Sequence, residues 1–286
     1  MKAYTAPAFK PVVVLRFHEQ FAVVRQRIEL IKGLNPGVPL YALYGGSEAV
    51  PEDIVDQFDG FCRLELLPEL AFRNVDLALI EWYRSVGHAV EFSHAYILEW
   101  DLIYVAPITT IMPIPRPAQS MLTGYTPMAK VEWKWDFTNG KKLGPLNEWL
   151  ELKRFVAERH RFIGPYYACI GPGAVLSREF FEYYQRLELP LLCHDEIRLP
   201  MVHSLGRLTV GDTGFYPPSW YLPEHEAWIR RFNVRRWEVE PRMITPGVRE
   251  GVMAYHPVRK LIDQRLIQRL ISKYNRGVSA PHVTGS

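Results

Sequence analysis

Cysteine is scarce in this sequence. The chain has 286 residues and only three cysteines, Cys62, Cys169 and Cys193, which lie far apart and form no CxxC pair. This spacing argues against a cysteine-based zinc site and against a disulfide framework. It is typical of proteins that fold in a reducing compartment, so we expect a cytoplasmic protein.

Long apolar runs and strong charge are also lacking. The most apolar stretch, near Ile97–Ile114, is interrupted by Glu99, Asp101 and several prolines, so no segment is expected to span a membrane. Met1–Pro11 contains two lysines and no apolar run, so no signal peptide is expected. The formal net charge of +3 is too small to indicate a nucleic-acid partner.

The N-terminal part of the chain alternates short β-branched runs with segments of helical periodicity. The expected elements are, in order, a strand at Val12–Phe17, a helix at His18–Leu34, a strand at Leu40–Tyr44, a short helix at Pro51–Phe58, a strand at Cys62–Leu66 and a helix at Val75–Val86. This alternation predicts a parallel α/β sheet. Such sheets bind ligands at the carboxyl ends of their strands.

The rest of the chain is less regular. We expect a proline-rich loop at Pro107–Pro117, a half-buried strand at Lys130–Phe137, helices at Asn147–His160, Ser177–Leu187 and Asp195–Leu205, and a basic amphipathic helix at Val258–Asn275. Ser177 is expected to cap its helix, and Pro200 to kink the next one or lie in its first turns.

Two acids stand inside the apolar run Ala95–Val105. If this run is a strand, Glu99 and Asp101 share one face and Trp100 points to the other. Burying two unpaired carboxylates is costly, and a divalent cation would offset that cost. Their hard oxygen ligands suit Mg²⁺ or Mn²⁺. The alternatives are a water-exposed strand edge or an ion pair with an arginine.

Glu99-Trp100-Asp101 and the elements before it resemble the GT-A glycosyltransferases. Those enzymes place an acidic D-x-D-type motif at the end of an apolar strand, and here glutamate replaces the first aspartate. The resemblance implies an α/β fold with a Rossmann-like mixed sheet flanked by helices. It also implies a Mn²⁺ or Mg²⁺ ion that binds the diphosphate of a UDP- or GDP-sugar donor.

A second motif, Leu191–Arg198, contains the triplet His194-Asp195-Glu196. It is similar to the start of the acceptor-side helix in inverting GT-A enzymes such as cellulose and chitin synthases, and Gly206 lies where those enzymes have a glycine. The resemblance implies that Asp195, or else Glu196, deprotonates the acceptor hydroxyl. The alternative is that these acids only stabilise a helix N-terminus.

A third motif is Gly247–Lys260, in which His256 precedes a proline and a basic pair. Several GT-A families supply a third metal ligand from a C-terminal histidine. By resemblance, His256 would be that ligand, and Arg259 and Lys260 would neutralise phosphate charge. The alternative is a surface turn before a solvated basic helix.

Further donor contacts are expected where the first strands end. By resemblance, these are Arg16 and His18 after the first strand, Tyr44, Gly45 and Gly46 after the second, Asp76 at the start of a helix, and Trp100 between the acids. The glycines equally suit a plain turn, and Asp76 equally suits a helix cap. Acceptor contacts are expected from aromatic residues of the second half, namely Trp133, Trp135, Tyr166, Tyr167 and Trp220.

These observations predict a metal-dependent glycosyltransferase that moves a sugar from a nucleoside diphosphate sugar to a hydroxyl of a saccharide or lipid-linked acceptor. We expect one domain at residues 10–276, with a donor half at 10–106, an acceptor half at 107–257, a basic helix at 258–276 and a disordered tail at 277–286. The basic helix would either dock on the domain or contact the inner membrane face. The alternatives are a nucleotidyltransferase or pyrophosphorylase, and a non-catalytic nucleotide-sugar-binding protein.

Overall fold

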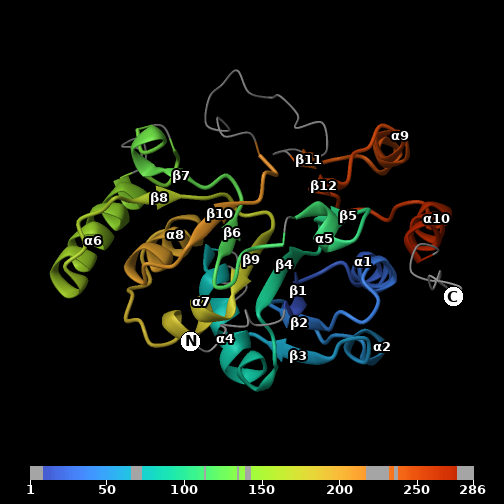
Figure 1. Ribbon diagram of the computed structural model, residues 1–286, viewed down its shortest axis with the longest axis horizontal. Helices are drawn as coiled ribbons and strands as arrows, with labels where there is room; N and C mark the ends of the chain where they lie inside the picture. The colour runs from blue at the N-terminus through green and yellow to red at the C-terminus, as the bar shows by residue number, and fades with distance from the viewer. Residues whose placement is uncertain are drawn as a thin grey trace, which may run out of the picture.

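The computed structural model describes residues 9–65, 73–112, 114–133, 135–138, 143–216, 232–234 and 238–275 (Figure 1). The expected tail at 277–286 and the acceptor candidate Trp220 lie outside these residues. The strands are β1 (Pro11–Phe17), β2 (Leu40–Tyr44), β3 (Gly60–Arg63), β4 (His94–Glu99), β5 (Ile103–Tyr104), β6 (Ser120–Leu122), β7 (Thr126–Pro127), β8 (Tyr167–Ala168), β9 (Ala174–Ser177), β10 (Val210–Asp212), β11 (Phe232–Val234) and β12 (Ala254–His256).

The helices alternate with the first strands and then follow less regularly. They are α1 (Phe21–Leu34), α2 (Glu52–Val55), α4 (Val75–Ser85), α5 (Ile108–Ile111), α6 (Leu143–His160), α7 (Arg178–Tyr184), α8 (Asp195–Leu205), α9 (Ile244–Arg249) and α10 (Gln264–Asn275), with short 3₁₀ turns η1 (Gly87–Ala89), η2 (Met128–Lys130) and η3 (Pro241–Met243).

The main sheet has seven strands in the order β10-β6-β9-β4-β1-β2-β3. Strand β1 pairs in parallel with β2 and β4, β2 with β3, and β6 with β10, whereas β9 runs antiparallel to β4 and β6. A smaller sheet has the order β11-β12-β5. The predicted mixed α/β class is therefore confirmed.

Both faces of the main sheet are covered by helices. Val13 and Leu15 of β1 belong to the same hydrophobic cluster as Val24 and Ile28 of α1. Val12 and Val14, on the opposite face, share a cluster with side chains of α4, α7 and α8. A strand buried on both faces must be apolar throughout, which explains the β-branched run of β1.

Asn35 explains where α1 ends. Its side-chain amide donates to the carbonyl of Ile31 at 2.8 Å, which satisfies a carbonyl in the last turn of the helix. Its side-chain oxygen accepts from the amide of Ile108 at 2.9 Å, at the start of α5. Ser177 caps α7 as predicted, since its hydroxyl accepts from the amide of Phe180.

Several expected elements differ from the structure. The strand expected through Ala95–Val105 ends at Glu99 and resumes only at Ile103. The loop expected at Pro107–Pro117 contains α5. The strand expected at Lys130–Phe137 is wrong, because residues 131–133 and 136–138 form turns.

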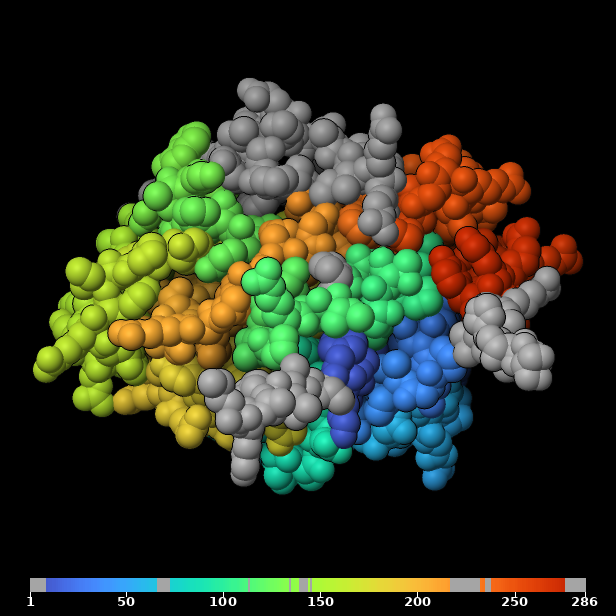
Figure 2. All heavy atoms as spheres, in the orientation of Figure 1, coloured from blue at the N-terminus to red at the C-terminus, as the bar shows by residue number. Residues whose placement is uncertain are grey.

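The C-terminal basic helix is shorter than expected, because α10 begins at Gln264 rather than at Val258. Its apolar side chains Leu266, Ile267 and Leu270 are buried in a cluster with Leu30 and Leu34 of α1. In Figures 1 and 2 the red C-terminal segment accordingly lies beside the blue α1 region. The apolar side of α10 is therefore not available for insertion into a membrane, and a contact through its basic side stays a prediction.

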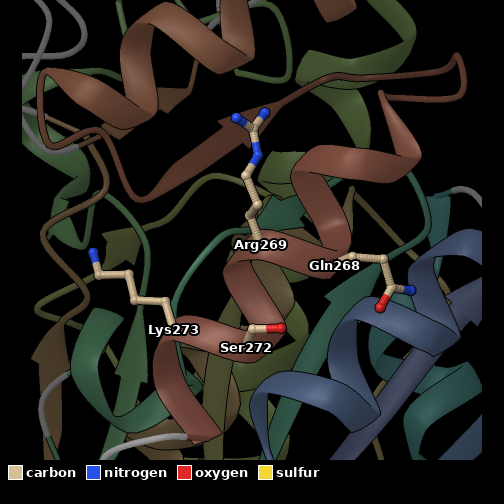
Figure 3. Close-up of a pocket in the computed structure, with 4 residues that line it drawn as sticks. All are labelled: Gln268, Arg269, Ser272 and Lys273. Carbon is tan, nitrogen blue, oxygen red and sulfur yellow. The ribbon is translucent and has the colours of Figure 1, made fainter.

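Figure 3 shows the outward side of α10, where Gln268 points toward α1 while Arg269 and Lys273 point away from it. Gln268 donates to Glu29 of α1 at 2.6 Å. Together with Ser272, these side chains line a shallow hollow of about 470 Å³. Among the described residues, no helix is both long enough and apolar enough to cross a bilayer.

Candidate metal and nucleotide site

Glu99, Asp101 and His256 come together at the end of β4. Each offers one ligand atom, and these three atoms lie within 4.8 Å of one another. The Nε2 atom of His256 lies 3.5 Å from a carboxylate oxygen of Glu99 and 3.6 Å from one of Asp101. The structure thus assembles the three residues predicted separately as metal ligands, and their role as ligands stays a prediction.

The local chain path explains how the acids meet. Glu99 is the last residue of β4, and the chain then turns, with the amide of Leu102 donating to the carbonyl of Glu99 at 2.9 Å. The two acids do lie close together, but the expected cause, a shared strand face, is wrong. The turn, rather than strand alternation, brings Asp101 beside Glu99.

His256 reaches the acids through the smaller sheet. It is the last residue of β12, which pairs antiparallel with β5, the strand that directly follows the turn. The amide of Val258 then donates to the carbonyl of Asp101 at 2.7 Å. These contacts join two segments that lie more than 150 residues apart in the sequence. Because of this distance, spacing in the sequence alone could not relate them.

The charges around the cluster favour an ionised Glu99, whereas the net shift of the Asp101 pKa is upward. Burial raises the pKa of Glu99, but His256, Arg16 and His18 outweigh this effect and bring that pKa down to about 2. Burial raises the pKa of Asp101, with Glu99 adding to the effect while His256 and Arg259 oppose it. Burial lowers the pKa of His256, but the two acids outweigh it and the net shift is upward.

This donor set fits a divalent cation. Two carboxylates and one imidazole are ligands that suit Mn²⁺ and related first-row ions. Two ligands of one octahedral cation lie roughly 3 Å apart when the bonds are about 2.1 Å long, so separations of 3.5 and 3.6 Å need only a small contraction. The partly exposed Glu99 and His256 leave the cluster open to a further ligand.

Arginines flank the cluster on two sides. Arg16, at the end of β1, lies 3.3 Å from Glu99, and the exposed Arg259 lies 3.6 Å from Asp101. Lys260 instead pairs with Glu240 at 3.0 Å and Glu238 at 4.0 Å. The structure therefore brings Arg16 and Arg259 to the site, whereas the ammonium group of Lys260 is paired with acids outside the cluster.

His18 and Trp100 lie beside the acids. The exposed imidazole of His18 meets the indole of Trp100 edge to face, with ring centroids 5.7 Å apart. Trp100 is buried, so its indole supports His18 more than it offers surface to a ligand.

The end of β2 is packed more tightly than expected. The ring of Tyr44 is fully buried, and its hydroxyl donates to the carbonyl of Glu48 at 2.9 Å. Gly46 is tightly enclosed, because a Cβ there would overlap the carbonyl oxygen of His18 and the Tyr44 hydroxyl. The expectation that the Tyr44 side chain contacts the nucleotide therefore needs correction. Gly45 is buried as well, whereas Gly46 is half-buried.

Asp76 also needs correction. Its carboxylate is fully buried and accepts from Arg198 at 2.6 and 2.8 Å and from Tyr184 at 2.5 Å. It is not the cap of α4 either, because Asn74 occupies that position. Asp76 ties α4 to α7 and α8, and a carboxylate enclosed in this way has no surface for a nucleotide.

Asp195 and Glu196 begin α8, with His194 as the capping residue. A carboxylate oxygen of Asp195 lies 2.5 Å from Nδ1 of His194, and Glu196 accepts from the amide of Gly171 at 2.7 Å. Burial raises the pKa of Glu196 to about 7, with Asp195 and Glu99 adding to the effect against His194 and Gly171.

The expected acceptor aromatics divide into exposed and packed rings. Trp133 is 70% exposed, whereas Trp135 is buried. The ring of Tyr167 stacks on Tyr125 with centroids 4.8 Å apart, and Tyr166 packs edge to face on Trp149. Among the described candidates, Trp133 alone presents most of its ring to solvent.

The burial of two arginines was not predicted from the sequence. Arg27 of α1 and Arg198 of α8 are each 1% exposed. Arg27 lies on the same helix stripe as Val23, Leu30 and Leu34, so its position among apolar residues was a usable signal of burial. Nothing in the sequence connects Arg27 with the acidic motif.

Comparison with known proteins gives only structural matches. No family model matches the chain, and no curated protein matches it in sequence. The galactosyltransferase LgtC, solved in complex with donor and acceptor sugar analogues, is 8% identical and matches with a TM-score of 0.41 over 94% of this chain and 97% of its own. An active-site mutant of LgtC is 9% identical over the same shares, with a TM-score of 0.42.

A third match is glucosyl-3-phosphoglycerate synthase from Mycobacterium tuberculosis, solved with Mn²⁺, UDP and glucosyl-3-phosphoglycerate. It is 18% identical, with a TM-score of 0.41 over 72% of this chain and 69% of its own. At these scores the overlap of the backbones is loose, so the functional argument depends on the residues of the site. The chain thus matches solved GT-A glycosyltransferase structures over most of its length, at low sequence identity.

Proposed function

We propose that this protein is a metal-dependent glycosyltransferase that transfers a sugar from a nucleoside diphosphate sugar to a hydroxyl group. The observation that carries the proposal is the convergence of Glu99, Asp101 and His256, within 4.8 Å of one another, at the carboxyl end of a parallel strand. Ligands of α/β sheets bind at this edge. Arg16 and Arg259 add positive charge on both sides of it.

The residues of the site suit a diphosphate leaving group. Glu99, Asp101 and His256 would hold a Mn²⁺ or Mg²⁺ ion, which when bound supplies positive charge to the departing diphosphate. The guanidinium of Arg259 is exposed and lies at the edge of the cluster, where it can donate to phosphate oxygens. Arg16 holds Glu99 in place and keeps it ionised.

Glu196 has the more suitable pKa and exposure of the two candidate bases. Its pKa of about 7 suits a group that accepts a proton near neutral pH. The carboxylate of Asp195 is more deeply buried and lies against His194. We therefore assign proton acceptance from the acceptor hydroxyl to Glu196 and an orienting role to Asp195.

The first experiment is a thermal-shift screen with UDP, GDP, dTDP and CMP and their common sugars, with and without Mn²⁺. Stabilisation by one nucleoside diphosphate that requires Mn²⁺ is expected in the wild type and is expected to disappear in Asp101→Asn. Asp53→Asn is the matched control, because Asp53 is an exposed acid paired with Arg25 at 2.6 Å, on α2 rather than in the cluster. No Mn²⁺-dependent shift with any nucleotide would overturn the proposal.

Measurement of turnover distinguishes a glycosyltransferase from a pyrophosphorylase and from a binding protein. A transferase releases nucleoside diphosphate from the sugar donor, whereas a pyrophosphorylase requires pyrophosphate to consume the same molecule. Glu196→Gln is expected to keep the Mn²⁺-dependent shift and to lose turnover. A wild-type protein that shows the shift but releases no nucleotide with a panel of hydroxyl acceptors would instead be a binding protein.

A further inference from the structure

Arg27 is a buried cation that lies between the two segments of the metal site. It stands on α1, is 1% exposed, and directs its guanidinium toward three backbone carbonyls. Its Nε donates to Trp100 at 3.2 Å, and one Nη donates to both Val258 and Lys260 at 3.0 Å. The other Nη donates to the side chain of Gln26 at 3.0 Å.

Each of these carbonyls belongs to a residue that is one or two positions from a residue of the candidate metal site. Trp100 lies between Glu99 and Asp101, and Lys260 follows Arg259. Val258 follows His256 by two residues, and its amide donates to the carbonyl of Asp101. One guanidinium therefore spans the acidic turn and the C-terminal segment.

Gln26 extends the same connection. Its side-chain amide donates to the carbonyl of Ile262 at 2.9 Å, and its side-chain oxygen accepts from the amide of Ile262 at 2.8 Å. Gln26 and Arg27 together thus fix residues 258–262 against α1 by side-chain hydrogen bonds.

The chemistry of arginine explains why this residue can do so. A guanidinium carries several donors in a rigid planar fork, and charge-assisted bonds to carbonyls offset part of the cost of its burial, which lowers the pKa of Arg27 to about 9. Among the described residues, no carboxylate is hydrogen-bonded to Arg27, and its donors are used on three backbone carbonyls and the side chain of Gln26. A lysine could not reach both segments with the same geometry.

We propose that Arg27 is a positioning residue that holds the acidic turn and the His256 segment in the geometry needed to bind one cation. This inference rests on the proposed function, since it assumes that Glu99, Asp101 and His256 bind a metal. Arg27 touches neither the metal nor the substrate and acts only through the backbone of the two segments.

The test compares Mn²⁺ affinity by calorimetry in wild type, Arg27→Lys and Ile28→Ala. Arg27→Lys keeps the positive charge and is expected to bind Mn²⁺ at least tenfold more weakly. Ile28→Ala is the control for general destabilisation, because Ile28 is a buried neighbour on α1 whose side chain makes no hydrogen bond to either segment. Equal Mn²⁺ affinity in folded Arg27→Lys and wild type would overturn the inference.

A second readout is hydrogen–deuterium exchange in metal-free protein. Arg27→Lys is expected to speed exchange at least tenfold at residues 254–262, which include the amides of Val258 and Ile262, relative to the β1–β2 core. Ile28→Ala is expected to show no such local excess. Unchanged exchange in this segment would refute the positioning role.

The two failures can be told apart. A wild type that binds no Mn²⁺ removes the proposed function, and the exchange result then decides separately whether Arg27 joins the two segments. If Arg27→Lys does not fold, Gln26→Met is measured in its place. It deletes both bonds to Ile262 and the bond from Arg27 to Gln26, but it keeps the guanidinium and its bonds to the backbone. A severalfold loss of Mn²⁺ affinity is expected there, and no loss would count against the inference.

Discussion

Glu196 makes a quantitative prediction about stability and pH. Its carboxyl sits at the start of α8 with a pKa raised by burial from 4.5 to about 7. Between these values the folded protein keeps the proton and the unfolded chain has released it. The free energy of unfolding must therefore fall as the pH rises through this window, and the contribution is fully present only below pH 4.5.

The magnitude follows from the two pKa values. A rise of the pKa from 4.5 to about 7, at about 1.4 kcal/mol for each pH unit, corresponds to about 3–4 kcal/mol. Glu196→Gln does not titrate, and the glutamine oxygen can still accept from Gly171. The variant should therefore gain stability relative to wild type by about 3–4 kcal/mol as the pH rises from 4.5 to above 7.

The assay is urea denaturation of both proteins in EDTA at half-unit steps between pH 4.5 and 8.5. EDTA is needed because a divalent cation near Glu196 would favour the ionised form. Glu91→Gln is the control for sign, since Lys10 lowers the pKa of the exposed Glu91 and any effect should run the other way. A difference between Glu196→Gln and wild type that stays within about 1 kcal/mol across the range would refute this reasoning.

Two further substitutions test the corrected roles of predicted residues. Asp76→Asn is expected to cost about 3–5 kcal/mol in urea denaturation, because it leaves the buried Arg198 without its carboxylate; a cost below about 1 kcal/mol would mean that the pair is not essential. Gly46→Ala is expected to lower the melting temperature by several degrees, since the methyl group would overlap the carbonyl oxygen of His18. An unchanged melting temperature would show that the end of β2 is less tightly packed than the structure indicates.

The regular first half of the fold was predictable because its strands are buried on both faces. A run such as Val12–Leu15 has few alternatives when helices of clear periodicity follow it. The prediction of a strand at Lys130–Phe137 was wrong, because alternation of polar and apolar residues does not by itself exclude turns. The alternation in this segment places Val131, Trp133 and Trp135 on one strand face, yet Trp133 is 70% exposed while the other two are buried, because the chain turns there.

The candidate site was predictable where chemistry limits the choice of residue. Two carboxylates in an apolar run need a positive charge or a cation to offset the cost of their burial, and this requirement identified Glu99 and Asp101 as candidates. Asp76 shows the limit of such reasoning, because an acid at the start of a helix looks the same in sequence whether it faces a ligand, caps the helix or meets a buried arginine. Only the fold reveals that Arg198, more than a hundred residues away, is its partner.

Because the candidate metal site is built from two segments that are distant in sequence, metal binding should depend on folding. Glu99 and Asp101 are separated from His256 by most of the acceptor half, so the unfolded chain cannot present the three groups to one cation. A ligand that binds only the folded state stabilises it by about 2.7 kcal/mol at a concentration of 100 times its dissociation constant. Mn²⁺ should therefore raise the melting temperature by itself, before any nucleotide is added. Because this gain requires both segments to be in register, we expect Arg27→Lys to reduce it, and Asp101→Asn to abolish it.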